Sequence, residues 1–485
     1  MSKTIAQLLE EYEPVIGLEV HVQLATHTKI FSGSATQFGS PPNSLVDPVV
    51  MGMPGTLPVF NKAVIELALR LGIATGSQIR TKSRFARKHY FYPDQPKGYQ
   101  ISQYDEPLLE HGHLDLLLGG AVKRVNLTRI HLEEDAGKNT HVGAVSHVDL
   151  NRAGAPLCEV VSEPEITSAE EAAEFMRSLH RLVRWLGVSE ADMEKGHLRC
   201  DANVSVKKRG AKELGVRTEL KNINSFRFVQ NAVDHEIARQ LRLIESGERI
   251  QRETRLWDAE AGQSYTMRTK EEANDYRYFP DPDLPALVIQ GDLMASVVRS
   301  MPELPIARFT RYTTAGISPD DARTLIGERA LADYFEAAVT AVGDNTKARA
   351  VGNWIVNELL GRLNADGKDI SSSPMPAAHI GALVKLVEAG TISGKIGKEI
   401  FDESYKTGED PAALVEKKGV TQISDEAQLW EIVDRVVTAN AKQAAEFASG
   451  KDGLFGFFVG QVMKQTQGRA NPVITTELLH KRLGR

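Results

Sequence analysis

The sequence predicts an α+β protein, in which a large antiparallel-rich sheet domain precedes an all-α helical domain and a small α-helical tail domain. Three observations support this fold class. Segments of alternating apolar and polar residues, separated by Gly and Pro turns, recur up to about residue 287, and a period of two is typical of half-buried strands. Apolar residues then recur at helical spacing over the remaining chain, and a proline-rich connection separates the two patterns.

Two helices are expected to interrupt the sheet. The first begins at Ser168, which forms a capping box with Glu171, and its apolar residues recur at helical spacing until Gly187. The second begins near Ser225 and ends towards Gly247. Each helix has one apolar face, so both are expected to pack against the sheet.

Two breaks divide the chain into three parts. The first is a proline-rich connection near residue 295, where proline removes backbone donors and fixes the chain in turns. The second is the polar segment 364–376, which contains Asp, Gly, Ser and Pro in close succession. We therefore predict a sheet domain over 1–295, a helical domain over 296–375 and a helical tail domain over 376–485.

The charge balance excludes an overall positive field. The chain has 58 Lys and Arg against 64 Asp and Glu, a formal net charge of −6, so any nucleic-acid partner must be held by a local basic patch. Basic residues are dispersed over the predicted tail and suggest a basic face; they are Lys395, Lys398, Lys442, Lys451, Lys464, Arg469, Lys481, Arg482 and Arg485.

The two cysteines, Cys158 and Cys200, are too few for a four-thiolate zinc site or a disulfide scaffold. They favour a reducing, cytoplasmic setting. The N-terminal segment has no apolar core typical of a signal peptide, and no stretch approaches the ~18 apolar residues of a membrane-spanning helix. We therefore expect neither secretion nor membrane insertion.

The first predicted strand, around residues 15–24, carries a polar face next to an apolar one. Glu19 and His21 share that polar face and project about 7 Å apart along the strand, close enough to reach one cation or one substrate group. A solvated sheet face would give the same alternation, and this strand alone does not separate the two interpretations.

Similar polar faces recur in later segments. Their residues are Arg129, His131 and Glu133, followed by Glu134 and Asp135; Arg199, Asp201, Asn203 and Ser205; and Arg217, Glu219 and Lys221. Carboxylate oxygens are the ligands that Mg²⁺ prefers, and guanidinium groups neutralise phosphate. A concave sheet with this polar face could therefore hold a nucleotide and a metal, although strand spacing alone leaves the solvated face open.

A basic and aromatic segment begins at Ser83 and reads SRFARKHYFYPDQPKGYQISQ. Its residues Arg87, Lys88 and Tyr90 could contact phosphate and stack on a base, whereas a twisted strand with half-buried aromatic residues is the alternative. The sequence contains no Ser-His-Asp elbow, Walker motif or dinucleotide fingerprint.

Eight ordered motifs resemble those of the GatB family, the B subunits of the bacterial Asp/Glu-tRNA amidotransferases known as GatCAB. They are VIGLEVHVQL at Val15, RKHYFYPDQPKGYQISQYD at Arg87, RIHLEEDAGK at Arg129, DLNRAGAPLCEVVSEPEI at Asp149, LRCDANVSV at Leu198, TELKNINSF at Thr218, DYRYFPDPDLP at Asp275 and GQVMKQTQGRANP at Gly460. The resemblance covers almost the whole chain.

The resemblance implies a cradle-like catalytic domain over 1–295, a helical linker domain and a tRNA-binding tail. It implies an ATP- and Mg²⁺-dependent ligase that phosphorylates the side-chain carboxylate of Asp on tRNA(Asn) or Glu on tRNA(Gln). Ammonia from the glutaminase subunit GatA then displaces the phosphate, and GatC completes a cytoplasmic heterotrimer. The resemblance leaves open whether one or both misacylated tRNAs are the substrate.

The resemblance also assigns residues. Glu19, His21, Glu134 and Glu219 match the catalytic metal-binding positions. The nucleotide-binding positions are Arg87, Lys88, Tyr90, Asp201 and Asn203. Strict alternation places Glu133 beside His131, so the choice of Glu134 over Glu133 requires a bulge in that strand. Some family members carry a cysteine-ligated zinc, for which this sequence lacks the thiols.

Two other functions compete with this assignment. One is a non-catalytic tRNA-binding scaffold, whose polar sheet face would recognise only the acceptor end. The other is a stand-alone metal-dependent phosphoesterase, which would act without GatA or glutamine. Only the ligase would need misacylated tRNA to form phosphate from ATP. An assay of phosphate formation with and without this tRNA therefore separates the ligase from both alternatives.

Overall fold

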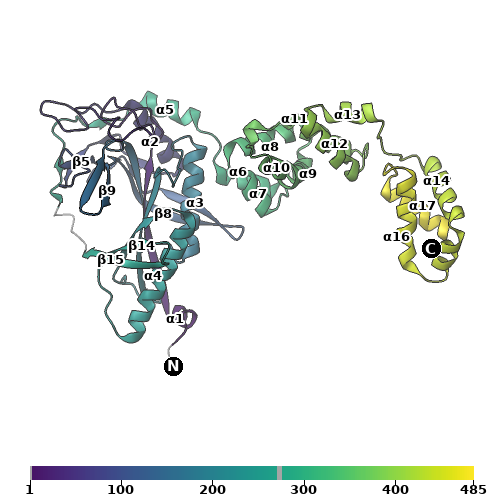
Figure 1. The fold of residues 1–485 in the computed structure, drawn as a ribbon, viewed down its shortest axis with the longest axis horizontal. Helices are drawn as coiled ribbons and strands as arrows, with labels where there is room; N and C mark the ends of the chain where they lie inside the picture. Colours follow the sequence, from purple (N-terminus) through teal and green to yellow (C-terminus); the bar gives the residue numbers. More distant parts are fainter. Residues whose placement is uncertain (1–2, 270–275, 485) are drawn as a thin grey trace. The chain divides into compact units, whose positions relative to one another are not determined.

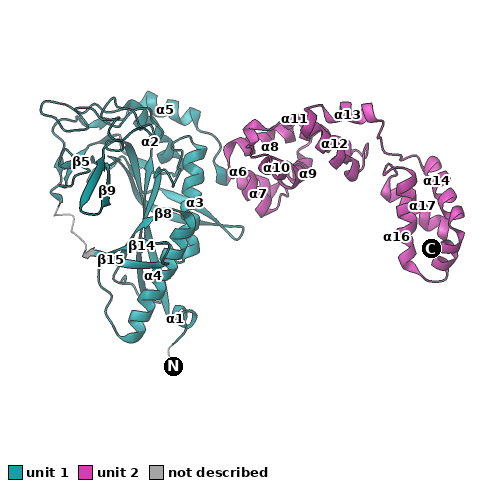
Figure 2. Cartoon of the chain, in the orientation of Figure 1, with its two compact units in different colours: residues 1–306 teal, residues 307–485 magenta. Residues whose placement is uncertain are grey.

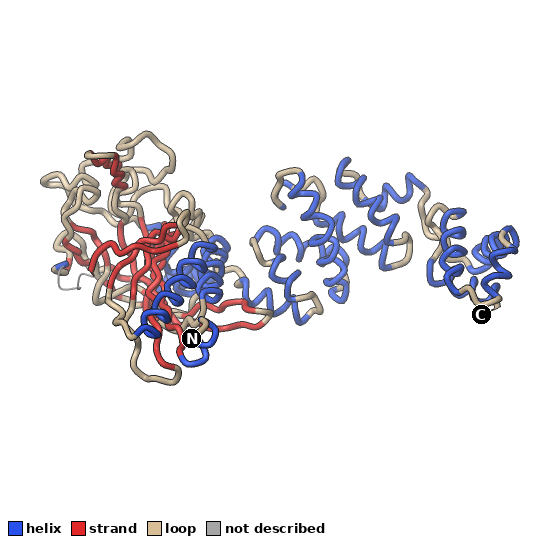
Figure 3. The backbone as a smooth tube through the Cα atoms, turned by 60° about the horizontal axis from the view of Figure 1, so that its bottom comes forward, coloured by secondary structure: helices blue, strands red, loops and turns tan. Residues whose placement is uncertain are grey.

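The computed structural model describes residues 3–269 and 276–484. Asp275, the first residue of one sequence motif, and Arg485 of the predicted basic face lie outside the described residues. The chain forms two compact units, residues 1–306 and 307–485 (Figure 2). Strands gather in the first unit and helices make up the second (Figure 3), which confirms the predicted α+β class.

The first unit is built on a sheet of 13 strands with the order β15-β14-β13-β12-β1-β11-β8-β5-β4-β16; β6 and β7 also pair with β8, and β2 pairs with β6. Among the described strands every pair is antiparallel except β13 with β14. The strands of this sheet are β1 (Tyr12–Gln23), β2 (Gln78–Ile79), β4 (Ala86–His89), β5 (Tyr99–Ser102), β6 (Leu109–Glu110), β7 (His113–Leu118), β8 (Ala121–Glu134), β11 (Pro156–Ser162), β12 (Leu198–Lys208), β13 (Thr218–Ile223), β14 (Glu253–Asp258), β15 (Gln263–Thr269) and β16 (Phe279–Pro280). Two small sheets stand apart, β9 (Lys138–Val142) with β10 (Val145–Asp149), and β3 (Lys82–Ser83) with β17 (Leu287–Val288).

The central strand β1 shows why the sheet has two different faces. Ile16, Leu18 and Val20 are fully buried, and they join one large apolar core with the apolar positions of neighbouring strands. The residues between them turn to the opposite face, because successive side chains of a strand alternate. Burial of one face therefore fixes which residues the other face presents.

Helices α3 (Ala169–Trp185) and α4 (Phe226–Ser246) pack against each other and cover the apolar face, α3 against β7 and α4 against β12 (Figure 1). Ser168 caps α3 by accepting a hydrogen bond from the Glu171 backbone at 3.1 Å. The Glu171 carboxylate accepts from Thr167 N instead of the cap residue, so the predicted capping box is only half formed. Gly247 ends α4 in the left-handed conformation, as expected.

The remaining helices of the first unit are short. They are α1 (Ile5–Glu11), α2 (Lys62–Ala74) and α5 (Gly291–Ser300), and α6 (Pro305–Thr314) begins at the end of this unit. No helix among the described residues is long and apolar enough to cross a membrane.

The second unit consists of packed helices. They are α7 (Pro319–Leu325), α8 (Arg329–Val342), α9 (Ala348–Trp354), α10 (Leu360–Ala365), α11 (Ala377–Glu388), α12 (Gly394–Thr407), α13 (Pro411–Lys418), α14 (Glu426–Ala439), α15 (Ala441–Ala448), α16 (Phe455–Gln465) and α17 (Pro472–Leu483). Ser318 caps α7 with Pro319 at its first position, as the sequence predicts.

Helix packing in this unit crosses the predicted division at 375. Helix α11 packs against α8, while a separate apolar core joins α14, α15, α16 and α17. The three-part division of the chain therefore stays a prediction.

The contact between α8 and α11 depends on Gly381. A Cβ atom at this position would lie 2.7 Å from Ala341 Cβ and 2.9 Å from Ala338 O. We predict that Gly381→Ala lowers the free energy of unfolding of the second unit by about 1–3 kcal/mol through overpacking. Chemical denaturation of the full chain, followed by amide exchange in α8 and α11, measures the change.

Gly361→Ala in α10 is the matched control, since no atom outside the helix lies within 4 Å of a Cβ there. It should raise the free energy of unfolding by up to about 1 kcal/mol through helix propensity. Equal effects of the two substitutions would contradict the packing argument.

A half-buried histidine links α3 to α4. The imidazole of His180 lies edge-on to Phe226 at 5.3 Å, and burial, with the nearby Arg184 and Arg181, lowers its pKa to about 4. The unfolded chain binds this proton near pH 6.5. The free energy of unfolding should therefore fall as pH drops from about 6.5 to 4, because protons then favour the unfolded state.

Amide exchange in α3 and α4, measured from pH 7 to 4, should show this loss of protection in the wild-type chain. His180→Gln should reduce the slope in that interval. An unchanged slope in the variant would assign the acid sensitivity to other groups.

Candidate functional site

Five neighbouring strands bring polar side chains to the face opposite the core. The strands are β8, β11, β1, β12 and β13. Across them, His21 lies opposite Glu159, Glu159 lies opposite His131, Glu19 lies opposite Asp201, and Asn203 lies opposite Glu219. Directly opposed residues share a face of the sheet, so the predicted polar faces form one continuous surface.

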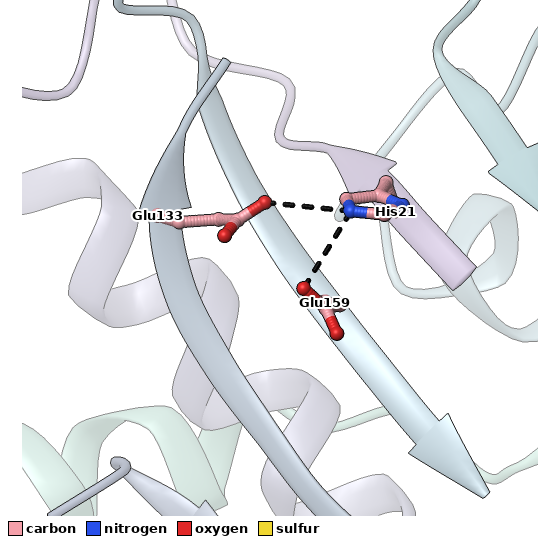
Figure 4. A group of neighbouring side chains, drawn as sticks. All are labelled: His21, Glu133 and Glu159. Atoms are coloured by element: carbon pink, nitrogen blue, oxygen red, sulfur yellow. Dashed lines mark ion pairs between the residues drawn. The ribbon is translucent and has the colours of Figure 1, made fainter. Parts of the chain in front are cut away.

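A carboxylate–histidine cluster, made of His21, Glu133 and Glu159, lies at the centre of this surface (Figure 4). Nε2 of His21 is 3.5 Å from a carboxylate oxygen of Glu133 and 3.5 Å from one of Glu159. His131 lies beside them, with Nε2 3.6 Å from Glu133 and 3.4 Å from Glu159. One potential ligand atom of each cluster residue lies within 4.8 Å of the others, close enough for a divalent cation to contact all three.

Glu133 is buried, with only 3% of its surface exposed. Burial alone would raise the pKa of its carboxyl. His131, His21 and Lys88, which lie around the carboxyl, outweigh burial and lower this pKa to about 2. The cluster therefore presents a charged carboxylate oxygen at neutral pH.

The structure places Glu133, and not Glu134, beside His21. β8 pairs with β11 in continuous register through Glu134, and the register shift lies at Val161 and Ser162, so the bulge that the choice of Glu134 required is absent here. Glu134 turns away, where it accepts a hydrogen bond from Ile101 N at 2.8 Å and pairs with Lys97. Glu134 therefore lies outside this cluster in the structure, and its assignment as a metal ligand stays a prediction.

Sequence reasoning missed Glu159. It lies between the buried residues Cys158 and Val160, so the segment PLCEVV has the same alternation as the other strands. That alternation was the available signal. The lone carboxylate in an apolar run marks the position where β11 contributes to the polar face.

A second polar group lies on β1, β12 and β13. Asn203 Nδ2 donates to Glu19 Oε1 at 2.9 Å. Lys221 pairs with Asp201 and lies 3.2 Å from Glu219, which also accepts from Thr254 Oγ1 at 2.9 Å. Burial would lower the pKa of Lys221, but Asp201 and Glu219 outweigh it and raise this pKa. Glu219 thus already contacts a permanent cation.

Positively charged side chains flank the cluster. Arg199, opposite His21 in β12, donates to Asp135 at 2.6 Å. Arg152 lies 3.3 Å from the same carboxylate and donates to the carbonyls of Ala136 and Gly137. These contacts fix residues 135–137, which directly follow β8. They also keep two guanidinium groups beside the Asp135 carboxylate.

The basic and aromatic segment forms β4 and the turn that follows it. Arg87 is held in ion pairs with Asp281 at 2.9 Å and Asp283 at 2.7 Å, and it lies over the Tyr99 ring. Tyr90 Oη donates to Asp94 at 3.2 Å. These contacts correspond to the half-buried strand that was the alternative interpretation. Lys88 differs from Arg87 and Tyr90, because its charge helps to lower the pKa of the Glu133 carboxyl in the cluster.

Comparison with known proteins adds an independent result. Residues 14–295 match the family model of the GatB/GatE catalytic domain, and residues 333–483 match that of the GatB domain. The chain belongs to the GatB family. The carboxylate–histidine cluster lies entirely within the matched catalytic domain of this family.

Relatives within the GatB family match over nearly the full length. Three of them are named as the B subunit of aspartyl/glutamyl-tRNA(Asn/Gln) amidotransferase. The protein of Geobacter sulfurreducens is 52% identical over 478 residues, covering 97% of this chain and 99% of the relative. That of Persephonella marina is 49% identical over 98% of this chain and 100% of the relative, and that of Carboxydothermus hydrogenoformans is 47% identical with the same coverages. The resemblance drawn from the motifs is thus confirmed.

The residues of the GatB-family cluster fit a divalent cation. Two carboxylates and one imidazole point to a common position, and the neighbouring groups lower the pKa of the Glu133 carboxyl. Oxygen-rich sites of this kind suit Mg²⁺ or Mn²⁺, and bound phosphates or water complete the coordination. His21, Glu133 and Glu159 would hold the ion.

We predict that Glu133→Gln weakens Mn²⁺ binding on the order of tenfold or more, because it removes a charged ligand. Calorimetry or electron paramagnetic resonance on the purified chain measures the dissociation constant. Glu134→Gln is the matched control and should change the constant less than about twofold, within the scatter of single substitutions outside a ligand set. A larger loss in Glu134→Gln than in Glu133→Gln would restore Glu134 as the ligand.

Proposed function

We propose that this chain is the kinase and amidotransferase subunit of a glutamine-dependent tRNA amidotransferase. With ATP it phosphorylates the side-chain carboxylate of Asp on tRNA(Asn), of Glu on tRNA(Gln), or of both. Ammonia then displaces the phosphate to give Asn-tRNA(Asn) or Gln-tRNA(Gln). The observation that carries the proposal is the carboxylate–histidine cluster inside the region matched by the GatB/GatE catalytic domain.

The chemistry requires activation of a poor acyl donor. A carboxylate oxygen of the substrate attacks the γ-phosphorus of ATP, and the bond from that phosphorus to the bridging oxygen breaks to release ADP. Ammonia then attacks the acyl carbon, phosphate leaves with the electrons of the C–O bond, and a proton is lost. Neither step needs a protein nucleophile, which agrees with the buried state of both cysteines.

The chain supplies positions and charges for this reaction. Mg²⁺, when bound, offsets the phosphate charge as it develops. His21, Glu133 and Glu159 would hold the ion, and His131, whose Nε2 lies within 3.6 Å of both carboxylates, would orient them. Lys88 and Arg199 place positive charge beside it. Glu19, Asp201 and Asn203 extend this polar sheet face, on which the nucleotide and the acceptor end would lie.

Other subunits and the tail complete the proposed enzyme. GatA would supply ammonia from glutamine, and GatC would join the two in a cytoplasmic heterotrimer. The tail would bind tRNA through dispersed basic residues, as the net charge of −6 requires a local contact. The last turn of α17 carries His480, Lys481 and Arg482, and Lys481 lies 5.7 Å above the Trp430 ring. The segment thus combines charge with an aromatic surface.

Glu159→Gln in the assembled complex tests the proposal. Phosphate formation from ATP with misacylated tRNA should fall on the order of 100-fold or more, since one ligand of the ion-holding cluster loses its charge. The dissociation constant for tRNA should change less than about twofold. Glu170→Gln, which removes an exposed charge from the start of α3, is the control and should retain activity.

Loss of tRNA binding with undiminished phosphate formation in Glu159→Gln would favour the scaffold function. Phosphate release without misacylated tRNA or glutamine would favour the phosphoesterase. Supplying Asp-tRNA(Asn) and Glu-tRNA(Gln) separately to the wild-type complex decides which of the two it amidates.

A further inference from the structure

Thr254, in β14, brings a buried hydroxyl to the polar sheet face. Strands β13 and β14 run parallel, and their pairing sets Thr254 directly beside Glu219. The Thr254 Oγ1 donates a hydrogen bond to Glu219 Oε2 at 2.9 Å, and only 2% of the threonine is exposed. Neither the sequence motifs nor the carboxylate–histidine cluster assigns a role to this residue.

The strand that carries Thr254 is held firmly from its other face. Its neighbours Glu253 and Arg255 turn towards α4, because side chains alternate along a strand. Arg255 Nη1 lies 2.8 Å from Glu253, and its Nε lies 4.0 Å from Glu236, a completely buried residue of α4. Arg239 of α4 lies 3.4 Å from Glu253. These ion pairs tie β14 to α4 and so fix the position of the Thr254 hydroxyl.

The two oxygens of the Glu219 carboxylate contact different groups. Oε2 accepts from Thr254, and Oε1 lies 3.2 Å from Lys221 Nζ. The last torsion of a glutamate side chain is broad, so a contact to one oxygen alone leaves the carboxylate plane free to turn. Lys221 in turn pairs with Asp201 of β12. The Thr254 hydroxyl therefore orients a row of charges that runs across three strands of the polar face.

A purely structural role is the alternative for Thr254. A buried carboxylate needs hydrogen-bond donors wherever it lies, and Glu219 is only 7% exposed. The chain offers a direct comparison, because Thr266 in β15 makes the same kind of contact, from its Oγ1 to Glu253 Oε2 at 2.7 Å. Thr266 lies opposite Arg255, on the α4 side of the sheet. The two threonines thus make equivalent hydrogen bonds on opposite faces.

We propose that Thr254 is a positioning residue for the phosphoryl transfer. Its hydroxyl orients Glu219, and through Glu219 the ammonium of Lys221, on the face where the substrates would lie. Thr254 acts through these groups and does not touch the substrate, since it is buried. Charges held in a fixed arrangement stabilise a transition state more than the same charges free to turn. The inference rests on the proposed function.

Phosphate formation by the assembled complex, from ATP with misacylated tRNA, tests the proposal. Thr254→Val keeps the shape of the side chain and removes the donor, so kcat should fall on the order of tenfold or more. The KM values of ATP and tRNA should change less than about twofold, because the contact acts on the transition state. Thr254→Ser keeps the donor and should retain kcat within about threefold. If the valine variant does not fold, Thr254→Ala provides the same comparison with Thr254→Ser.

Thr266→Val is the matched control and should leave kcat within about twofold of the wild-type value. Three results would each overturn the inference. They are an undiminished kcat in Thr254→Val, equal losses in Thr254→Val and Thr254→Ser, which would indicate packing of the methyl group, and equal losses in Thr254→Val and Thr266→Val, which would indicate general loosening of the sheet edge.

Crystal structures of the wild-type and Thr254→Val complexes provide a readout that does not depend on activity. In the variant, the Glu219 carboxylate should turn and lose its 3.2 Å contact with Lys221. A carboxylate that keeps its position would overturn the inference. A wild-type complex that forms no phosphate would instead contradict the proposed function, so the two failures are distinguishable.

Discussion

The pairing of β1 with β11 on one side and β12 on the other determines the position of almost every residue in the candidate site. One face of β1 is fully buried in the core of the first unit. A shift of one residue in either pairing would move apolar side chains to the polar face and carboxylates into the core. The burial energy of Ile16, Leu18 and Val20 therefore stabilises the register that places His21 opposite Glu159 and Glu19 opposite Asp201.

The charges of the site depend on one another within this frame. His131, His21 and Lys88 lower the pKa of the buried Glu133 carboxyl, and Asp201 and Glu219 raise the pKa of Lys221. The Glu133 carboxylate is thus stabilised by groups that the folded sheet brings close from β1, β4 and β8, which is the condition for retaining an ionised group away from water. The formal net charge of −6 includes carboxylates that are engaged in such contacts. It therefore does not exclude an RNA partner.

Sequence periodicity was sufficient for the fold class, for the ends of α3 and α4, and for the polar face of β1. It could not supply contacts that depend on which strands become neighbours. Glu159 was missed because nothing in its own segment shows that β11 lies beside His21, and the ion pair of Lys221 with Asp201 depends on the pairing between β12 and β13. The choice between Glu133 and Glu134 was different, since alternation alone favoured Glu133 and the resemblance to the family favoured Glu134, and the ligand assignment stays a prediction.

The position of the register shift in β11 has a consequence for how the family can vary. The shift lies at Val161 and Ser162, beyond the pairs that hold His131 and Glu133. The connection from Asp135 to Ala155 contains the separate β9–β10 hairpin. Insertions and deletions in that hairpin leave the paired residues in place, whereas a single added residue between Arg129 and Glu133 would exchange the two faces of β8. Length variation among homologues should therefore be concentrated in the hairpin and absent from the short segment before it.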